Sequence, residues 1–252
     1  TVFSVLIALA ISFVIIFLVS DQPLEAIKYL LIGPFTNKRS MGNVVESMIP
    51  LIFTGTGVCI MFSANQINLA GEGAFHIGGL IASCVAIKLT ATFVSPFMAL
   101  LCAGLVGALF TAIPAIMKIT TTASEMVSSL MINYLALYFG NYMLNNVIGD
   151  PKASAASYKL ADAAELPVLI QGTRVHLGFI IAIAVAVLGY FFLYRTKTGY
   201  ELRLAGENEE FARYSGISIV KVIMISQLLG GFVAGLGGGV EMLSPIYARF
   251  TW

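Results

Sequence analysis

The sequence contains little charge and lacks the residue patterns on which most enzymes depend. Only 11% of its 252 residues are Asp, Glu, Lys or Arg, and the net charge is +1. Soluble domains usually carry about 25% of these residues. A net charge near zero gives no electrostatic basis for binding nucleic acid or an anionic membrane surface. Because the sequence has no HExxH, no intramembrane Asp pair and no Ser/His constellation, an intramembrane enzyme is disfavoured.

Cysteine is also scarce, and its positions exclude two further classes of site. Cys59, Cys84 and Cys102 are far apart and lie in apolar runs, without a CxxC pair or a metal-type Cys/His spacing. We interpret them as small buried hydrophobic residues and predict neither a metal centre nor a disulfide. The pattern GxxxxGK[ST] is absent as well, so the sequence contains no phosphate-binding loop of its own.

Apolar residues, in contrast, make up 58% of the chain, and the mean hydropathy is +0.91. Twenty helical residues rise about 30 Å, the thickness of the hydrocarbon core of a bilayer. Apolar runs close to that length cover residues 1–20, 44–64, 70–87, 94–117, 126–147, 176–194 and 221–242. We therefore predict an all-α membrane protein, a polytopic bundle of transmembrane helices that forms one domain over residues 1–252. Both chain ends look cut, and we expect a longer polypeptide.

One apolar run contains an acidic residue among glycines. Residues 65–79 read NQINLAGEGAFHIGG and place Glu72 between two of the four glycines. An isolated carboxylate at mid-bilayer costs about 2.5–3.5 kcal/mol, and each glycine weakens a helix by about 1 kcal/mol. Broken helices are tolerated where they line a cavity or are covered by protein. We predict a broken or kinked segment near residues 65–79, with His76 one turn after Glu72 on the same face.

The run at 126–147 carries amides and tyrosines at helical spacing. Asn133 and Asn141 recur two turns apart, and Tyr134 lies beside the first of them. Asn amides can hydrogen-bond a base or a ribose, and tyrosine rings can stack on a flat heterocycle. Hydrogen bonding between helices is the alternative. Glu125, just before this run, follows Thr122 at the spacing of a helix capping box.

Two other stretches carry recognisable patterns. Gly231, Gly235 and Gly239 repeat every four residues, which predicts a helix face that another backbone approaches closely. Residues 207–217, ENEEFARYSGI, lie in a loop rich in charge of both signs. Their spacing predicts a short amphipathic helix beside the membrane, although a solvated loop helix fits as well. The cluster of Lys and Arg residues around this loop favours the cytoplasmic side, whereas the total count of Lys and Arg on the two sides does not, so charge alone leaves the orientation open.

The same loop resembles a known family. Glu210-Phe211-Ala212, with Gly216 four residues after the alanine, resembles the EAA-x-x-x-G loop of permease subunits of binding-protein-dependent ABC importers. The wider string 199–217 resembles the sugar and nucleoside branch more closely. Segments 67–75, INLAGEGAF, and 124–142, SEMVSSLMINYLALYFGNY, resemble nucleoside-type members of that branch.

The resemblance implies a permease of a bacterial ATP-driven importer, a multi-pass protein of the cytoplasmic (inner) membrane. Residues 207–217 would form a coupling helix that binds a cytoplasmic ABC ATPase through Glu209, Glu210, Ala212 and Gly216. ATP and Mg would be used by that ATPase, and this chain would hold no cofactor. The other implied partners are a second permease subunit and an extracytoplasmic substrate-binding protein. The implied substrate is a nucleoside-like small molecule, with riboflavin or a sugar as alternatives.

The resemblance also bears on Glu72. Nucleoside-type permeases show a pattern like FN-I-G-x-E-G-Q here, which Asn68, Glu72 and Gly73 match, whereas Ala70 and Ala74 replace a Gly and the Gln. Glu72 either fixes the break, together with Asn68 and backbone amides, or contacts substrate. The residues expected along the substrate pathway are Asn68, Glu72, His76, Asn133, Tyr134 and Asn141. A rival hypothesis is an ion- or proton-coupled transporter in which Glu72 and His76 form the coupling site.

Overall fold

The structure is a bundle of helices, as predicted. It is a computed structural model that describes residues 2–19, 22–89, 95–121, 123–151, 156–160, 164–245 and 249–250. The elements are α1 (Val2–Val19), α2 (Pro23–Thr36), α3 (Lys38–Ser63), α4 (Gly71–Lys88), α5 (Ser95–Thr121), α6 (Glu125–Met143), the π-helical turn η1 (Leu144–Ile148), α7 (Gly178–Arg195), α8 (Lys197–Glu207), α9 (Glu209–Tyr214) and α10 (Ile219–Met242). Within the described residues, β-structure is limited to two isolated antiparallel bridges.

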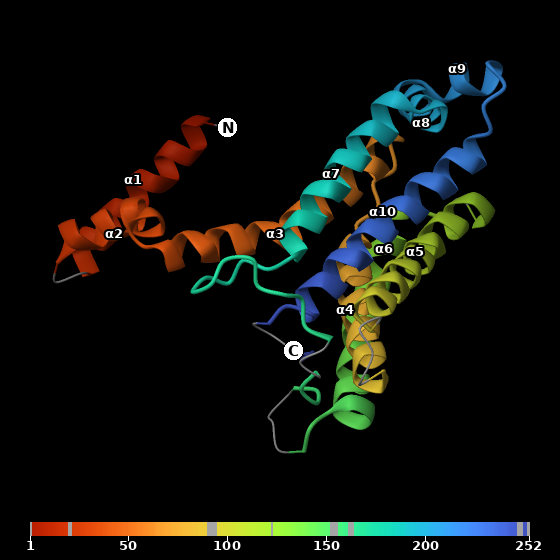
Figure 1. Ribbon diagram of the computed structural model, residues 1–252. Helices are drawn as coiled ribbons and strands as arrows, with labels where there is room; N and C mark the ends of the chain where they lie inside the picture. The colour runs from red at the N-terminus through yellow and green to blue at the C-terminus, as the bar shows by residue number, and fades with distance from the viewer. Residues whose placement is uncertain are drawn as a thin grey trace.

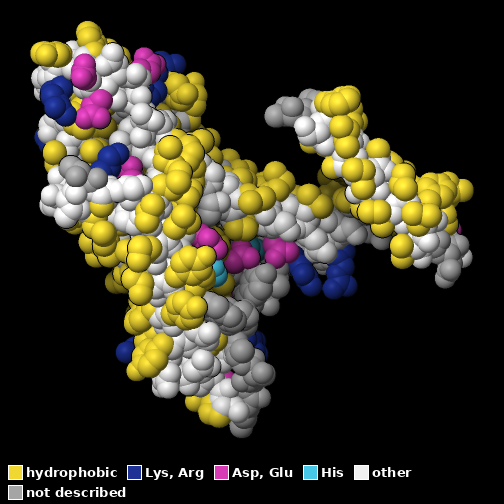
Figure 2. Space-filling view, turned by 180° about the vertical axis from the view of Figure 1, so that it is seen from behind, with side chains coloured by type: hydrophobic (Ala, Val, Ile, Leu, Met, Phe, Trp, Pro, Cys, Tyr) yellow, Lys and Arg dark blue, Asp and Glu magenta, His cyan; other side chains and the backbone are white. Residues whose placement is uncertain are grey.

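Among the residues that the structure describes, four helices are long and apolar enough to cross a membrane by length and composition, namely α3, α5, α7 and α10. Helix α1 contributes a shorter apolar helix, and Figure 1 shows α1 and α2 beyond the N-terminal end of α3, away from the other helices. Hydrophobic side chains cover much of the flanks of the bundle in Figure 2, whereas Lys, Arg, Asp and Glu lie mainly at the end formed by α8 and α9 and in a second group near the middle of the view. This division matches a protein whose flanks face lipid and whose α8–α9 end faces water.

Helix α10 is the centre of the bundle and packs against α3, α4 and α5 (Figure 1). Its glycines permit this because they leave room for neighbouring backbones. A Cβ atom on Gly235 would meet the carbonyl oxygen of Ala103 and lie 2.9 Å from Cα of Gly107, both in α5. Gly231 and Gly239 face α5 in the same way. The three glycines of the predicted repeat therefore lie at the α5–α10 contact.

Glycines of α3 and α4 complete this central packing. A Cβ on Gly78 of α4 would lie 2.6 Å from Cα of Gly235, and one on Gly57 of α3 would lie 2.7 Å from the carbonyl oxygen of Gly230. These partner atoms are backbone atoms, which cannot rotate away as a side chain can. Glycine weakens a helix, but here Gly78 and Gly79 allow α4 to lie directly on α10.

Two further helices, α2 and α8, lie outside the apolar runs of the sequence. Helix α2 begins at Pro23, a residue suited to the first turn of a helix, and also contains Pro34. Helix α8 begins after Thr196, whose hydroxyl accepts a hydrogen bond from the amide of Gly199 at 3.0 Å. These two helices were not predicted, because α2 and α8, with 14 and 11 residues, are shorter than a membrane span and α8 is also polar.

The packing of α10 leads to a stability prediction. We expect Gly235→Ala to destabilise the folded bundle by about 2 kcal/mol, because overpacking against backbone atoms typically costs 1–3 kcal/mol. Gly55→Ala is the matched control, since a Cβ there meets no described heavy atom within 4 Å and α3 gains helix propensity. Thermal unfolding in detergent measures both variants. Equal melting temperatures for Gly235→Ala and the wild type would contradict this account of the α5–α10 contact.

Candidate functional site

The predicted break is present, but it is shorter than predicted. Helix α3 ends at Ser63, Asn65 adopts a positive φ of 53°, and α4 begins at Gly71. Asparagine tolerates this left-handed conformation better than most residues. The four glycines at 71, 73, 78 and 79 are all helical. The break therefore comprises residues 64–70, and we use that name for them below.

The break runs from the α8–α9 end into the interior of the bundle. Near its beginning, Ser63 and Asn65 lie against Gly206 of α8. Near its end, Asn68 hydrogen-bonds Gln227, the ninth of the 24 residues of α10, which begins at Ile219. Helix α4 thus starts about a third of the way along α10 rather than at the end of the bundle. A helix that starts inside a membrane bundle is typical of the substrate sites of transporters.

Side chains of α6 satisfy the backbone of the break. The amide of Leu69 donates to Oγ of Ser129 at 3.1 Å, and the carbonyl oxygen of Leu69 accepts from Nδ2 of Asn133 at 2.8 Å. Oδ1 of Asn133 accepts from the amide of Gly73 at 3.0 Å, in the first turn of α4. Backbone groups at membrane depth must be paired because no bulk water reaches them. The side-chain amide of Asn133 therefore hydrogen-bonds the backbone of a neighbouring element. Hydrogen bonding between helices was the alternative to substrate contact for this residue.

Asn68 has a comparable position on the other side of the break. Its side chain is only 1% exposed. Oδ1 accepts from the amide of Ala70 at 2.7 Å, and Nδ2 donates to Oε1 of Gln227 at 2.6 Å. Asn68 thus caps the turn before α4 and ties it to α10.

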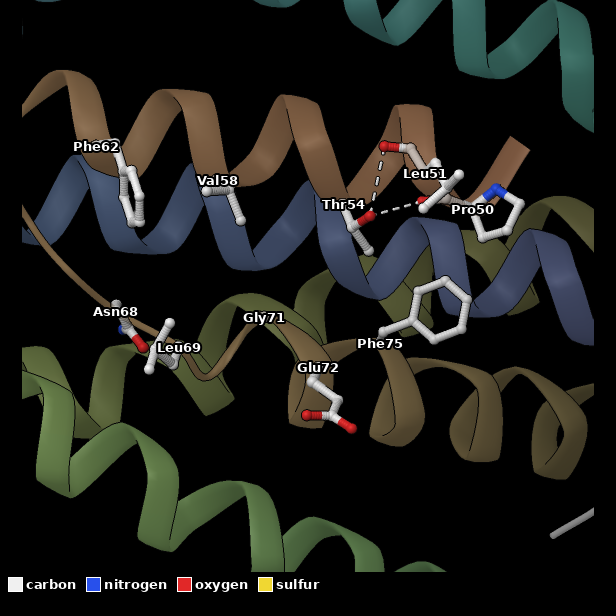
Figure 3. Close-up of a pocket in the computed structure, with 10 residues that line it drawn as sticks. All are labelled: Pro50, Leu51, Thr54, Val58, Phe62, Asn68, Leu69, Gly71, Glu72 and Phe75. Carbon is white, nitrogen blue, oxygen red and sulfur yellow. Dashed lines mark hydrogen bonds between the residues drawn. The ribbon is translucent and has the colours of Figure 1, made fainter. Parts of the chain in front are cut away.

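Glu72 differs from both asparagines because it is exposed on the first turn of α4. It borders a pocket of about 350 Å³ between α3 and the break, shown in Figure 3. The pocket is lined by Pro50, Leu51, Thr54, Val58, Phe62, Asn68, Leu69, Gly71, Glu72 and Phe75. A mostly apolar cavity of this size with a few polar groups is the usual form of a small-molecule site. A negative charge in the first turn of a helix is also favourable.

The remaining predicted pathway residues do not line this pocket. His76 is half-buried one turn along α4 and interacts electrostatically with Glu72. Tyr134 is 62% exposed on α6. Asn141 accepts a hydrogen bond from Asn145 at 3.0 Å. In the part of the chain that the structure describes, no group of three or more His, Cys, Asp or Glu side chains could hold a metal ion.

The sequence reading missed several residues around the break. The α3 side of the pocket was not predicted, because an apolar residue that lines a pocket looks like one that faces lipid. Glu125 was interpreted as part of a capping box, but the N-cap of α6 is Ser124, and Thr122 lies outside the described residues. The Glu125 carboxylate instead contacts Lys118 and Gln227. Gln227, a polar residue in the middle of an apolar run, was the sequence signal that indicated a buried polar contact here.

The predicted coupling helix is α9 with its flanking turns. Ala212 is fully buried, whereas Phe211 and Tyr214 are 56% and 92% exposed. Glu209 and Glu210 are exposed in the first turn of α9. The alanine of the EAA pattern therefore faces the bundle, where only a small side chain fits, and an aromatic pair faces outward.

The ends of α9 explain two further residues of the pattern. Oδ1 of Asn208 accepts from the amide of Phe211 at 2.9 Å and caps the start of the helix. Gly216 has a φ of +83° after the end of the helix, and the following amide, of Ile217, donates to the carbonyl oxygen of Ala212 at 3.0 Å. Glycine adopts this conformation at no steric cost.

Comparisons with known proteins identify relatives of the chain. A profile of the family described as "Branched-chain amino acid transport system / permease component" matches residues 40–251. The guanosine ABC transporter permease protein of Bacillus subtilis (strain 168) is 32% identical over 215 residues, which cover 84% of this chain and 62% of that protein. The glucose ABC transporter permease protein of Haloferax volcanii is 30% identical over 254 residues, or 96% of this chain and 67% of that protein.

A more distant relative is the probable riboflavin import permease protein of Treponema pallidum (strain Nichols). It is 22% identical over 256 residues, covering 98% of this chain and 67% of that protein. No solved structure matches the chain significantly. The chain spans 62% of the length of the guanosine permease of Bacillus subtilis. With the family profile matching residues 40–251 and four helices able to cross a membrane, the chain belongs to this family of transport-system permeases and is a multi-pass protein of the cytoplasmic (inner) membrane.

Proposed function

We propose that the chain is the permease subunit of an ATP-driven importer that moves a nucleoside-like small molecule across the cytoplasmic membrane. The observation that carries the proposal is the break, which joins the α8–α9 end of the bundle to a pocket beside Glu72. A continuous chain of packed and hydrogen-bonded elements of this kind can couple substrate movement to events at one end of the bundle. The pocket volume of about 350 Å³ suits a small molecule.

The substrate class draws on the named relatives and on the chemistry of the pocket. Relatives that cover most of the chain are named as guanosine and nucleoside permeases. The exposed carboxylate of Glu72 can accept hydrogen bonds from ribose hydroxyls or base N–H groups. The aromatic rings of Phe62 and Phe75 on the pocket wall can contact a flat heterocycle. Riboflavin and a sugar such as glucose remain alternative substrates, since other relatives are named for them.

The partners follow from α9 and from the missing phosphate-binding loop. An exposed aromatic pair on a water-facing helix is typical of a protein-binding surface. We assign this surface, Phe211 and Tyr214, to a cytoplasmic ABC ATPase that uses ATP and Mg, and this chain itself carries out no catalysis. A second permease subunit and an extracytoplasmic substrate-binding protein complete the proposed assembly. ATPase movement switches the access of the pocket only if the two states bind the ATPase with different affinity.

Reconstitution tests the substrate assignment. The full-length permease is placed in liposomes with its ATPase and binding protein, and ATP hydrolysis is measured with nucleosides, riboflavin, ribose or glucose. We expect nucleosides to stimulate hydrolysis most. Stimulation by none of them, together with uptake that follows a proton gradient, would support the rival secondary transporter with Glu72 and His76 as its coupling site.

A second prediction concerns Glu72. We expect Glu72→Gln to lower nucleoside uptake about tenfold or more at low substrate concentration, because a hydrogen bond to a charged group contributes about 1.5–3 kcal/mol. Glu25→Gln, on α2 and outside this pocket, serves as the matched control. Radiolabelled uptake and permease assembly are measured together. Lost assembly would assign Glu72 to fixing the break, and unchanged uptake would remove it from the pathway.

A third prediction concerns α9. We expect the double variant Phe211→Ala, Tyr214→Ala to weaken copurification of the ATPase strongly, because buried aromatic anchors at interfaces contribute about 2 kcal/mol or more each. Tyr158→Ala is the control, since Tyr158 is also exposed, at 47%, but lies in the loop between η1 and α7. ATPase that copurifies with the double variant as well as with the control would refute α9 as the docking surface.

A further inference from the structure

A second set of polar side chains lies between the break and the α8–α9 end. We call it the buried network, and it consists of Gln66 in the break, Lys118 in α5, Glu125 in α6 and Gln227 in α10. Nζ of Lys118 lies 2.9 Å from Oε2 of Glu125 and donates to Oε1 of Gln66 at 2.6 Å. Nε2 of Gln227 donates to the other carboxylate oxygen of Glu125 at 2.9 Å. Both oxygens of this carboxylate are therefore bound.

The carboxylate of the ion pair is largely removed from water, whereas its lysine partner is partly exposed. The side chain of Glu125 is 6% exposed and that of Lys118 is 33% exposed. Removing the two charges from water costs free energy that can equal or exceed the gain from their attraction. A buried ion pair therefore adds little to the free energy of unfolding by itself. Buried ionic groups serve better to fix one arrangement of the elements that carry them. Here the pair joins α5 and α6 where the break enters the bundle.

The network reaches the pocket through Gln227. Oε1 of Gln227 accepts from Nδ2 of Asn68 at 2.6 Å, and Asn68 lines the pocket and caps the turn before α4. The backbone carbonyl of Gln227 accepts from Oγ1 of Thr111 at 2.7 Å, which fixes this part of α10 to α5. A shift of the Glu125 carboxylate is therefore passed through one side chain to the residue that positions the first turn of α4.

The network reaches the α8–α9 end through Lys118 and Gln66. Both line a cavity of about 90 Å³ together with Glu209, the first residue of α9. Helix α8 also contacts the start of the break directly, because a Cβ on Gly206 would meet the carbonyl oxygen of Ser63 and lie 3.2 Å from the amide nitrogen of Asn65. Displacement of α8 or α9 thus changes both the cavity and the end of the break to which Lys118 is bound.

We propose that the buried network transmits movement of α8 and α9 to the substrate pocket, with Lys118 and Glu125 as positioning residues for transport. Lys118 holds Gln66 at one end of the break, and Glu125 holds Gln227, which in turn holds Asn68 at the other end. Because Glu125 binds both Lys118 and Gln227, Gln66 and Asn68 are linked to each other, and the break moves as a unit. This inference rests on the proposed function, since it concerns how ATPase movement reaches the pocket.

Three variants of the full-length permease, assembled with its ATPase and binding protein in liposomes, test the proposal. Glu125→Gln removes the charge at constant shape, Lys118→Met removes the ammonium, and Lys118→Arg retains the cation. Nucleoside transported per ATP hydrolysed is measured beside hydrolysis without substrate. We expect the first two variants to lower this ratio on the order of fivefold to tenfold, at the lower end of the roughly 5–150-fold range that is typical of coupling between sites. Hydrolysis without substrate remains within about twofold of the wild type, and Lys118→Arg retains most of the coupling.

Lys197→Met is the matched control. Lys197 pairs with Glu201 at 3.8 Å on the surface of α8 and is 90% exposed, so this substitution removes a solvated ion pair at the same end of the bundle. We expect it to leave the transported-per-hydrolysed ratio unchanged. Should Lys118→Met assemble poorly, Glu125→Gln carries the test, because Gln can keep a hydrogen bond to Lys118.

The outcomes separate this inference from the proposed function. A wild-type ratio in both Glu125→Gln and Lys118→Met would overturn the inference while the wild-type assembly still transports nucleoside. Equal loss of assembly, hydrolysis and uptake in all three variants, Lys118→Arg included, would show a merely structural pair and also overturn it. Failure of the wild-type assembly itself to respond to substrate would count against the proposed function instead.

Discussion

The rest of the structure depends on how the inner end of the break is paired inside a membrane bundle. Bulk water does not reach membrane depth, so the backbone groups of Leu69 and Ala70 bind side chains of the protein. The amide of Asn133 bonds both sides of the turn into α4, and Asn68 caps that turn from the opposite side. Once these bonds are made, α4 can begin in the interior, and Glu72 lies exposed on its first turn next to a pocket.

Close packing of glycines provides the frame on which this arrangement rests. Gly78 of α4 and Gly107 of α5 both approach Gly235 of α10, so three helices meet at nearly backbone-to-backbone distance. The hydrophobic effect does not drive helices together in lipid, so van der Waals packing at such close contacts holds them together instead. They leave little room for α4 and α10 to slide against each other. Movement is therefore easier in the break and in α8 and α9 than in the glycine-packed centre.

The sequence predicted those features that depend on local patterns. Length and hydropathy located the apolar helices, the glycine-flanked carboxylate indicated the break, and the repeat at Gly231, Gly235 and Gly239 indicated a packed face. Features that depend on distant partners were not predicted. Gln227 and Glu125 are 102 residues apart, and Asn68 and Gln227 are 159 apart, so no local spacing reveals either contact. The local sequence around Glu125 fits a capping box, and only its contacts with Lys118 and Gln227 show its actual role.

The most direct test of the central claim is the accessibility of position 72 in the assembled transporter. A cysteine introduced by Glu72→Cys is labelled with a membrane-impermeant thiol reagent, with and without substrate and in ATP-bound and nucleotide-free states, and the native cysteines of the wild type give the background. If the break positions the first turn of α4 beside the translocation path, labelling changes with nucleotide state and substrate slows it. Labelling that is the same in every state, with substrate and without it, would contradict the account.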